Sequence, residues 1–228
     1  MTQQLRWHQF ATADEVAKAT YQQILAAAEQ AIEQRGTFKL VLAGGSTPEK
    51  AYRLLIDAKT DWSKWHIYFG DERCLPKDDV DRNSVMAAQA FLNAVAIPQS
   101  QLHPMPTELG TEESAAAYRL VVANALPFDL VLSGIGEDGH TASLFPNHQH
   151  HNTDELVHAV YDSPKPPSER ISLSHACLAN TQKLVFIVTG SNKQQAVQDW
   201  KTQQNNLPVS QIFPECGVDI FIDQAAQY

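Results

Sequence analysis

The 228-residue sequence contains only three cysteines and has no long uninterrupted apolar run. Cys74, Cys177 and Cys216 are scattered, so they form neither a metal-binding pair nor an even disulfide framework, and a reducing cytoplasm is the expected environment. No apolar run approaches the ~20 residues that span a bilayer, so no membrane partner is expected. The first fifteen residues lack an apolar segment behind a basic start, and we expect no secretory signal there.

Positive charge is also scarce, because 17 lysines and arginines stand against 26 aspartates and glutamates and give a formal net charge of −9. Extended nucleic-acid binding needs a basic surface, so nucleic acid is not an expected partner. The composition is still compatible with a small anionic ligand, since a few local cations can dominate one pocket. The positions of individual lysines and arginines are therefore informative.

The sequence does contain a regular alternation of apolar runs and helical segments. Residues 13–35 predict a helix that opens with a capping box of Thr12 and Glu15 and ends at Gly36. Strand-forming apolar runs occupy 38–43, 65–70, 128–134, 183–190 and 218–222. Further helices are expected at 48–57, with Thr47 as N-cap and Pro48 in its first position, and at 84–95, 111–125 and 191–203.

Apolar strands that alternate with helices predict an α/β fold, with a Rossmann-like parallel sheet covered by helices on both faces. We see no internal repeat and no linker, so one domain over residues 1–228 is expected. The proline-rich stretch 162–174, DSPKPPSERISLS, predicts a mobile loop. In open α/β sheets ligands bind at the carboxyl ends of the strands, so the site is expected on four loops: 44–48, 71–83, 134–147 and 190–193.

The stretch FDLVLSGIGEDGHTASLFP, residues 128–146, combines glycines with a histidine. Its Gly-x-Gly-x-x-Gly spacing at 134–139 is that of a dinucleotide-binding turn, but that motif needs a long helix after its third glycine. Only HTASLF precedes Pro146, so no dinucleotide cofactor is expected, and the glycines would instead let the backbone approach a small ligand. His140 follows them and, with an ordinary pKa of about 6.5, can take a proton near neutral pH; a capping or surface role is the alternative.

Three other turns carry groups that suit an anion. AGGSTP at 43–48 offers free amides, two hydroxyls and a helix N-terminus, although it lacks the lysine of a P-loop and an ordinary capped turn explains it equally well. Lys193 lies in a second strand-to-helix turn, TGSNK, where a solvated lysine is the alternative. Arg73 ends the charged run DER at 71–73, and its planar fork suits phosphate or carboxylate unless it pairs within that run.

Other catalytic and metal motifs are incomplete. The pattern Asp79-x-Asp81-x-Asn83 resembles a calcium loop, but Ser84 and Ala90 replace the glycine and glutamate that such a loop needs. Without a Gly-x-Ser-x-Gly motif, a serine acyl-enzyme route has no support. Three clustered histidines lack matching ligands at zinc spacing, so no metal is expected there: His148, His150 and His151.

Taken together, the loop motifs resemble one known family. GGSTP, FGDER, GIGEDGHTASLFP, PKPPSER and VTGSNK occur in the order found in 6-phosphogluconolactonases, and IFIDQAA resembles the end of that family's domain. The resemblance covers nearly the whole chain, and GEDGHTASLFP and GDER are its specific motifs. It implies the Rossmann-like fold of the sugar-phosphate isomerase/deaminase type, shared with glucosamine-6-phosphate deaminases and ribose-5-phosphate isomerases.

The resemblance also implies an activity: hydrolysis of 6-phospho-glucono-1,5-lactone to 6-phosphogluconate, step two of the oxidative pentose phosphate pathway, without metal or cofactor. His140 would be the general base, oriented by Asp138 or Glu137. Arg73, a loop amide or Lys193 would stabilise the oxyanion. The substrate and its phosphate would be held by Gly45, Ser46, Thr47, Asp71, Arg170 and Lys193.

Two positions depart from the family pattern. Ala43 stands where a serine often precedes GGS, and Arg82 stands where a serine commonly precedes Asn83, which makes Arg82 a further candidate phosphate ligand. We expect a sugar-phosphate lactone as the partner, a monomer or weak homodimer, and closure of the loop 147–168 over the substrate.

Two alternative functions are considered for this chain: a sugar-phosphate deaminase and a sugar-phosphate sensor. Deaminases of the same fold typically read DGHIAFNEP where this chain reads DGHTASLFP, and ammonium release would identify them. Sugar-phosphate sensors of transcription regulators carry a basic DNA-binding segment, for which this chain has neither the length nor the charge.

Overall fold

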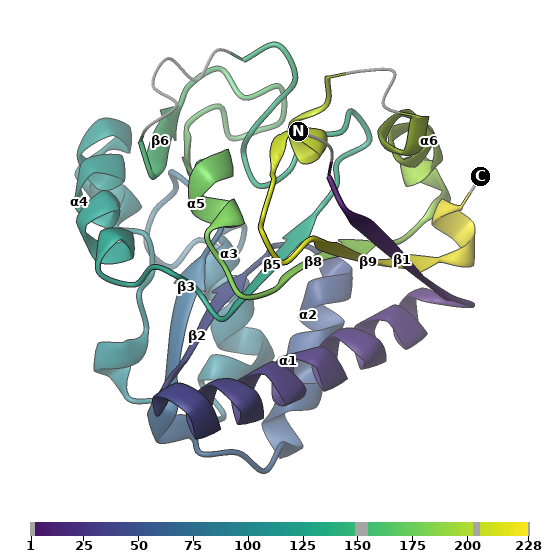
Figure 1. Cartoon of the computed structure of the whole chain (residues 1–228). Helices are drawn as coiled ribbons and strands as arrows, with labels where there is room; N and C mark the ends of the chain where they lie inside the picture. Colours follow the sequence, from purple (N-terminus) through teal and green to yellow (C-terminus); the bar gives the residue numbers. More distant parts are fainter. Residues whose placement is uncertain (1–2, 149–154, 203–205, 228) are drawn as a thin grey trace.

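The computed structural model describes residues 3–148, 155–202 and 206–227, and its centre is a six-stranded parallel sheet (Figure 1). The strands lie in the order β1-β9-β8-β5-β2-β3, and each neighbouring pair is parallel. Their bounds are β1 Leu5–Phe10, β2 Phe38–Leu42, β3 Trp65–Phe69, β5 Leu130–Gly134, β8 Leu184–Val188 and β9 Val218–Asp223. The parallel α/β fold predicted from the alternating apolar runs is confirmed.

Helices cover both faces of this sheet, with α1 and α2 on one face and α5 and α6 on the other (Figure 1). Their bounds are α1 Ala13–Arg35, α2 Ser46–Arg53, α3 Asn83–Ala87, α4 Thr111–Ala123, α5 His175–Ala179 and α6 Gln194–Thr202. The predicted caps of α1 are present: Glu15 N–H donates to Thr12 Oγ1 over 3.2 Å, and Gly36, at φ 75°, donates to the Ile32 carbonyl over 2.9 Å.

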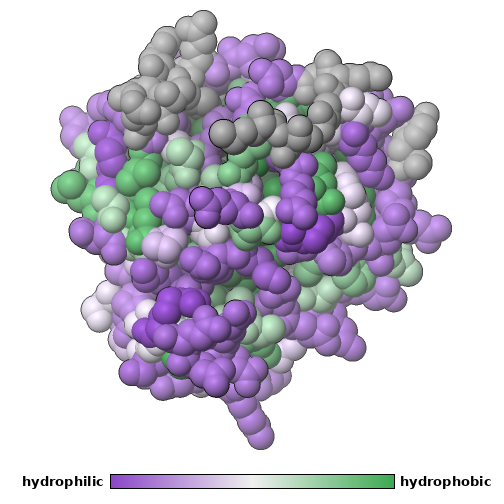
Figure 2. All heavy atoms as spheres, in the orientation of Figure 1, coloured by the Kyte–Doolittle hydropathy of each residue, from purple (hydrophilic) through white to green (hydrophobic). Residues whose placement is uncertain are grey.

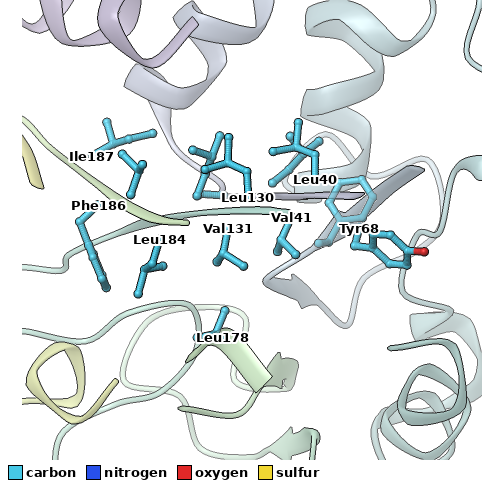
Figure 3. Close-up of a cluster of buried hydrophobic side chains, with 14 of the residues drawn as sticks. Leu40, Val41, Tyr68, Leu130, Val131, Leu178, Leu184, Phe186 and Ile187 are labelled. Atoms are coloured by element: carbon cyan, nitrogen blue, oxygen red, sulfur yellow. The ribbon is translucent and has the colours of Figure 1, made fainter. Parts of the chain in front are cut away.

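The core lies between the sheet and these two helical layers (Figure 3). Successive strand residues point to opposite faces, so Leu40 and Leu130 lie on one side while Val41 and Val131 lie on the other, with Leu178 of α5. All five side chains are fully buried. Burial of each such side chain contributes about 1.5–3 kcal/mol, which is why these strands are apolar on both faces.

A second, antiparallel sheet stands beside the first and was not expected. It consists of β4 Asp71–Arg73, β7 Arg170–Leu173 and β6 Val157–Val160 in the order β4-β7-β6. The prediction of a loop throughout 162–174 is therefore wrong at its C-terminal end. Arg170 pairs there with Arg73 and Val160. These partners lie outside the stretch 162–174, so their backbone hydrogen bonds cannot be predicted from its sequence alone.

Several element boundaries also differ from those expected. β1 was missed, although it pairs along its whole length with β9. α2 begins at Ser46 with Gly45 (φ 112°) as N-cap, so the Thr47 cap is wrong; the Thr47 hydroxyl instead lies 2.7 Å from Thr189 Oγ1. Three of the predicted helices combine two helical types, whereas α4 is α-helical throughout. α2 runs on as a 3-10 turn at Leu54–Asp57, α3 runs on as a π-helical turn at Ala88–Leu92, and α6 follows a 3-10 turn at Ser191–Lys193.

Hydrophilic side chains dominate the face of the molecule in Figure 2, and apolar atoms gather mainly over α4. Leu120 of α4 is 70% exposed, in keeping with that apolar area. Among the described residues, no helix combines the length and apolarity that crossing a bilayer requires.

Candidate active site

A cavity of about 520 Å³ opens at the carboxyl ends of the central strands. This volume falls within the range of small-molecule sites, about 300–1,000 Å³. The four loops expected to hold the site all line it, and residues 165–170 add a fifth wall. Eight of the nine residues proposed for catalysis or substrate binding lie in its lining: Gly45, Ser46, Thr47, Asp71, Arg73, His140, Arg170 and Lys193.

The ninth residue, Asp138, contacts the His140 ring from outside the lining. Its Oδ1 lies 2.5 Å from His140 Nδ1 and accepts the His140 backbone N–H over 3.2 Å. An ionised carboxylate can only accept, so Nδ1 carries the proton and Nε2 keeps its lone pair. No described residue hydrogen-bonds Nε2. Glu137, the other candidate, accepts instead from Asn192 Nδ2 over 2.6 Å. The structure therefore places Asp138, rather than Glu137, against the ring.

Burial sets the protonation of this pair. It lowers the pKa of His140 below 6.5, and the charge of Lys165 lowers it further, while Asp138 and Asp71 oppose both effects. For Asp138 burial acts in the opposite direction, but the hydrogen bond and charge of His140 outweigh it and the net pKa is lowered. Near neutral pH the pair therefore consists of a neutral imidazole and an ionised carboxylate.

This arrangement gives a prediction for the titration of the ring. By histidine-selective NMR, the midpoint of His140 should lie below 6.5, and Asp138→Asn should lower it further, because the carboxylate favours the protonated ring. Comparison of the two proteins at the same ionic strength provides the control. A midpoint above 6.5 in the unmodified protein, or an upward shift in the variant, would contradict the assigned charges.

Gly136 makes room for the His140 ring. A Cβ at position 136 would lie 2.0 Å from Nδ1 and 2.1 Å from Cε1 of His140, and 2.7 Å from Asp138 Oδ1. The Gly136 N–H also donates to the His140 carbonyl over 2.8 Å, which closes the turn. The expectation that the glycines serve ligand approach thus misses a tighter constraint, since the backbone at position 136 must first accommodate the His140 side chain itself.

Asp71 connects three of the loops. It is 8% exposed, and its carboxylate accepts from Ser143 Oγ over 2.6 Å and from Asn83 Nδ2 over 3.0 Å. Asn83 packs closely on Gly44, where a Cβ would lie 2.2 Å from Asn83 Oδ1. Asp71 thus lines the cavity as a fixed negative charge with both oxygens already engaged by the protein.

Two of the predicted cationic side chains, Arg73 and Lys193, line the cavity in different surroundings. Arg73 donates through Nη1 to the Asp81 carbonyl, and no described residue accepts from its Nη2. Lys193 lines the cavity, and its pKa is lowered by burial and by the nearby charge of Lys165, against the opposing charges of Glu137 and Asp138.

Arg82 does not line the cavity, contrary to its candidacy as a phosphate ligand. It is 3% exposed, its Nε lies 3.5 Å from Glu72 Oε2, and its Nη2 donates to the Met105 carbonyl over 2.9 Å. The buried charge of Glu72 holds the guanidinium inside the protein, away from the ligand cavity.

Five polar lining residues were not assigned from the sequence: Lys165, Asn83, Ser133, Thr189 and Asn192. Lys165 and Asn192 belong to the quoted motifs PKPPSER and VTGSNK, so the motifs themselves contained a signal for them. Thr189 belongs to VTGSNK as well, and its hydroxyl lies 2.7 Å from Thr47 Oγ1, 142 positions away in the chain. Within the described ranges no three metal-ligating side chains come together, while His150 and His151 lie outside those ranges.

Known proteins are similar to this chain in sequence and in fold. A family model described as glucosamine-6-phosphate isomerases/6-phosphogluconolactonase matches residues 11–221. A Mycobacterium leprae protein named 6-phosphogluconolactonase is 40% identical over 197 residues, which cover 78% of this chain and 76% of that protein. The solved structure of 6-phosphogluconolactonase from Trypanosoma brucei is 28% identical, with a TM-score of 0.87 and coverage of 99% of this chain and 98% of that one.

A rice protein (Oryza sativa subsp. indica) named as a probable chloroplastic 6-phosphogluconolactonase 3 is 35% identical over 212 residues. The match covers 83% of this chain but 64% of the rice protein, so the chain spans less than two thirds of that relative.

Proposed function

The chain belongs to the glucosamine-6-phosphate isomerase/6-phosphogluconolactonase family, and we propose that it hydrolyses 6-phospho-D-glucono-1,5-lactone to 6-phospho-D-gluconate, step two of the oxidative pentose phosphate pathway. The observation that carries the proposal is the His140–Asp138 pair. His140 lines the cavity and its Nε2 has no partner among the described residues, while several lysine and arginine side chains line the same cavity. Three free cysteines are consistent with action in the cytoplasm: Cys74, Cys177 and Cys216.

In the first step of the proposed reaction, His140 Nε2 takes a proton from water as the water oxygen attacks the lactone carbonyl carbon. The carbonyl π electrons move to its oxygen and form a tetrahedral oxyanion, while Asp138 stabilises the imidazolium. In the second step the oxyanion re-forms the C=O bond, the bond to the ring oxygen breaks, and the imidazolium returns its proton to that oxygen. The product acid then ionises, and His140 is neutral again.

The lining residues supply the remaining requirements of the reaction. Arg73 Nη2 is the proposed donor to the oxyanion, since no described residue accepts its hydrogen bonds. The phosphate is assigned to Lys193 and to the N-terminal turn of α2, where Gly45, Ser46 and Thr47 offer backbone amides, two hydroxyls and the positive end of the helix dipole. Because this group is remote from the carbonyl, its binding energy serves to position the ring.

The direct test is lactone hydrolysis measured against a blank without protein, because the lactone also opens unaided. The substrate can be generated in place with glucose-6-phosphate dehydrogenase, and the released acid can be followed at constant pH. The proposal requires a rate orders of magnitude above the blank. A rate equal to the blank, or ammonium release from glucosamine 6-phosphate, would assign the chain to another activity of the family's fold.

Gly136→Ala tests the geometry of the base without removing it. Gly136 does not have a positive φ, so alanine strains the structure through its methyl group, which must displace the His140 ring or Asp138. We expect kcat to fall about 10–100-fold, in line with the cost of a 1 Å misplacement of a catalytic group. Gly70→Ala is the matched comparison, because Gly70 also lines the cavity but its added methyl group would meet the nearest protein atom at an ordinary 3.6 Å. Equal activity of the two variants would show that ring position is not limiting.

A further inference from the structure

Arg170 donates most of its hydrogen bonds to backbone carbonyls of residues 165–167, which precede it in the chain. Its Nε donates to the Pro167 carbonyl over 3.2 Å, and its Nη2 donates to the Lys165 and Pro166 carbonyls, each over 3.0 Å. A guanidinium has five N–H donors, so only the two on Nη1 remain without an acceptor among the described residues. A guanidinium binds an anion with two parallel hydrogen bonds, either from Nε and Nη2 or from Nη1 and Nη2. Both pairs include Nη2, whose hydrogens already bond to carbonyls of the protein.

The segment that Arg170 holds is closed on itself. Ser163 N–H donates to the Ser168 carbonyl over 2.9 Å, and Ser163 Oγ donates to the Lys165 carbonyl over 2.8 Å. Arg170 is 5% exposed, and its Cζ lies 5.8 Å from the Phe145 ring centroid, within the range of a cation–π contact. The segment 163–168 is thus a compact loop held on one buried arginine.

This loop places Lys165 in the cavity lining. Its ammonium group forms no hydrogen bond or ion pair with another described residue, whereas its backbone N–H and carbonyl are both engaged. The charge of Lys165 lowers the pKa of Lys193 and of His140, so the ammonium lies near both. Two ammonium groups in one cavity repel each other unless an anion lies between them.

We propose that Lys165, together with Lys193, binds the phosphate of the substrate, and that Arg170 is a positioning residue that acts through the loop 163–168. The inference rests on the proposed lactonase function, and it replaces the role of substrate ligand that the family resemblance implied for Arg170. A phosphate monoester carries about 1.5–2 negative charges at pH 7, which match two ammonium groups better than the partial charge of a developing oxyanion does.

A double-mutant cycle separates this arrangement from direct binding by Arg170. Calorimetry would give the Kd of 6-phosphogluconate for the unmodified protein, Lys165→Met, Arg170→Gln and the double variant. We expect Lys165→Met to raise Kd about 10–100-fold, as for the loss of a charge-assisted hydrogen bond. Arg170→Gln should raise Kd comparably by itself but less than about twofold in the Lys165→Met background, because residues that act as one unit are non-additive.

Three further variants serve as controls for the double-mutant cycle. Lys165→Arg should recover most of the affinity, since it restores the charge. Arg170→Lys keeps a charge but cannot reach three carbonyls, so it should resemble Arg170→Gln and replaces it if that variant fails to fold. Lys64→Met, in the 3-10 turn before β3, is the control for loss of a lysine elsewhere.

The outcomes are distinct. An active enzyme with unchanged affinity after Lys165→Met would overturn the inference and leave the lactonase function standing. Equal effects of Arg170→Gln in both backgrounds would make Arg170 a direct ligand and would also overturn it. A wild type that neither hydrolyses the lactone nor binds 6-phosphogluconate would remove the proposed function and, with it, this assignment.

Discussion

His140→Ala is expected to lower kcat for lactone hydrolysis by about 10²–10⁴-fold, the usual contribution of a positioned general base. The variant keeps the cations and the α2 amides, so substrate binding should change far less than kcat. Because the ring is 16% exposed and its bonds are confined to Asp138 and its own turn, its removal should leave the fold intact. Initial rates at pH 7, corrected for the blank, measure the effect.

Two controls make this result specific to the base. His66 lies at the amino end of β3, at the opposite end of the strands from the cavity, so His66→Asn should retain full activity. Added imidazole should partly restore His140→Ala, because it can occupy the space that the ring vacates and take the proton. A folded His140→Ala protein with nearly normal kcat would mean that another group activates the water.

Most of the central sheet was predictable because five of its strands are short, continuous apolar runs that can be recognised from the local sequence alone. β2, β3, β5, β8 and β9 are runs in which nearly all residues are buried, and a parallel strand between two helical layers requires this composition. β1 escaped prediction because its sequence, LRWHQF, mixes polar and apolar residues. Its place is set by β9, whose paired residues lie 213 positions further along the chain.

The second sheet was not predictable for a related reason. β4 is the charged triplet Asp71–Arg73, and β7 follows a proline-rich segment. Strands of three or four residues carry little periodicity, and β4 lies about 100 residues before β7, its antiparallel partner. Propensity read along the chain contains no information about such pairings.

For the site, most of the residues that line the cavity were predictable, and the hydrogen-bond partners of its cationic side chains were not. His140 and the strand-end loops could be identified by residue type and position. Whether Arg82, Arg170 or Lys165 meets a ligand depends on which acceptors already hold each cation. That follows from the burial of Glu72 and from the carbonyls of residues 165–167, which are tertiary features.

Glu72→Gln should destabilise the protein by about 3–5 kcal/mol, the cost of leaving one partner of a buried ion pair without the other. Glu72 is fully buried and its Oε2 lies 3.5 Å from Nε of Arg82, itself 3% exposed. Its carboxylate also accepts three backbone N–H groups, from Arg73, Asn83 and Ser84, over 2.7–3.0 Å. Urea unfolding followed by circular dichroism gives the change in the free energy of unfolding.

Arg82 provides an internal control, since it has a second acidic neighbour. Glu108 Oε2 lies 4.0 Å from Arg82 Nη1, but the Glu108 side chain is 52% exposed. Solvent screens that contact, so Glu108→Gln should cost no more than about 1 kcal/mol. Similar losses from the two variants would show that burial does not set the strength of the Glu72–Arg82 pair.

The Glu72 effect should extend to the active site, because the carboxylate holds the backbone of Asn83. The Asn83 side chain bonds Asp71 and packs on Gly44, so a loosened Asn83 disturbs two walls of the cavity together. Adding Arg82→Met to Glu72→Gln removes the unpaired charge and should recover part of the stability. It cannot restore the lost acceptors, so we expect kcat/KM to stay reduced in a protein that is again stable. Recovery of both quantities together would mean that Glu72 acts on the site only through global stability.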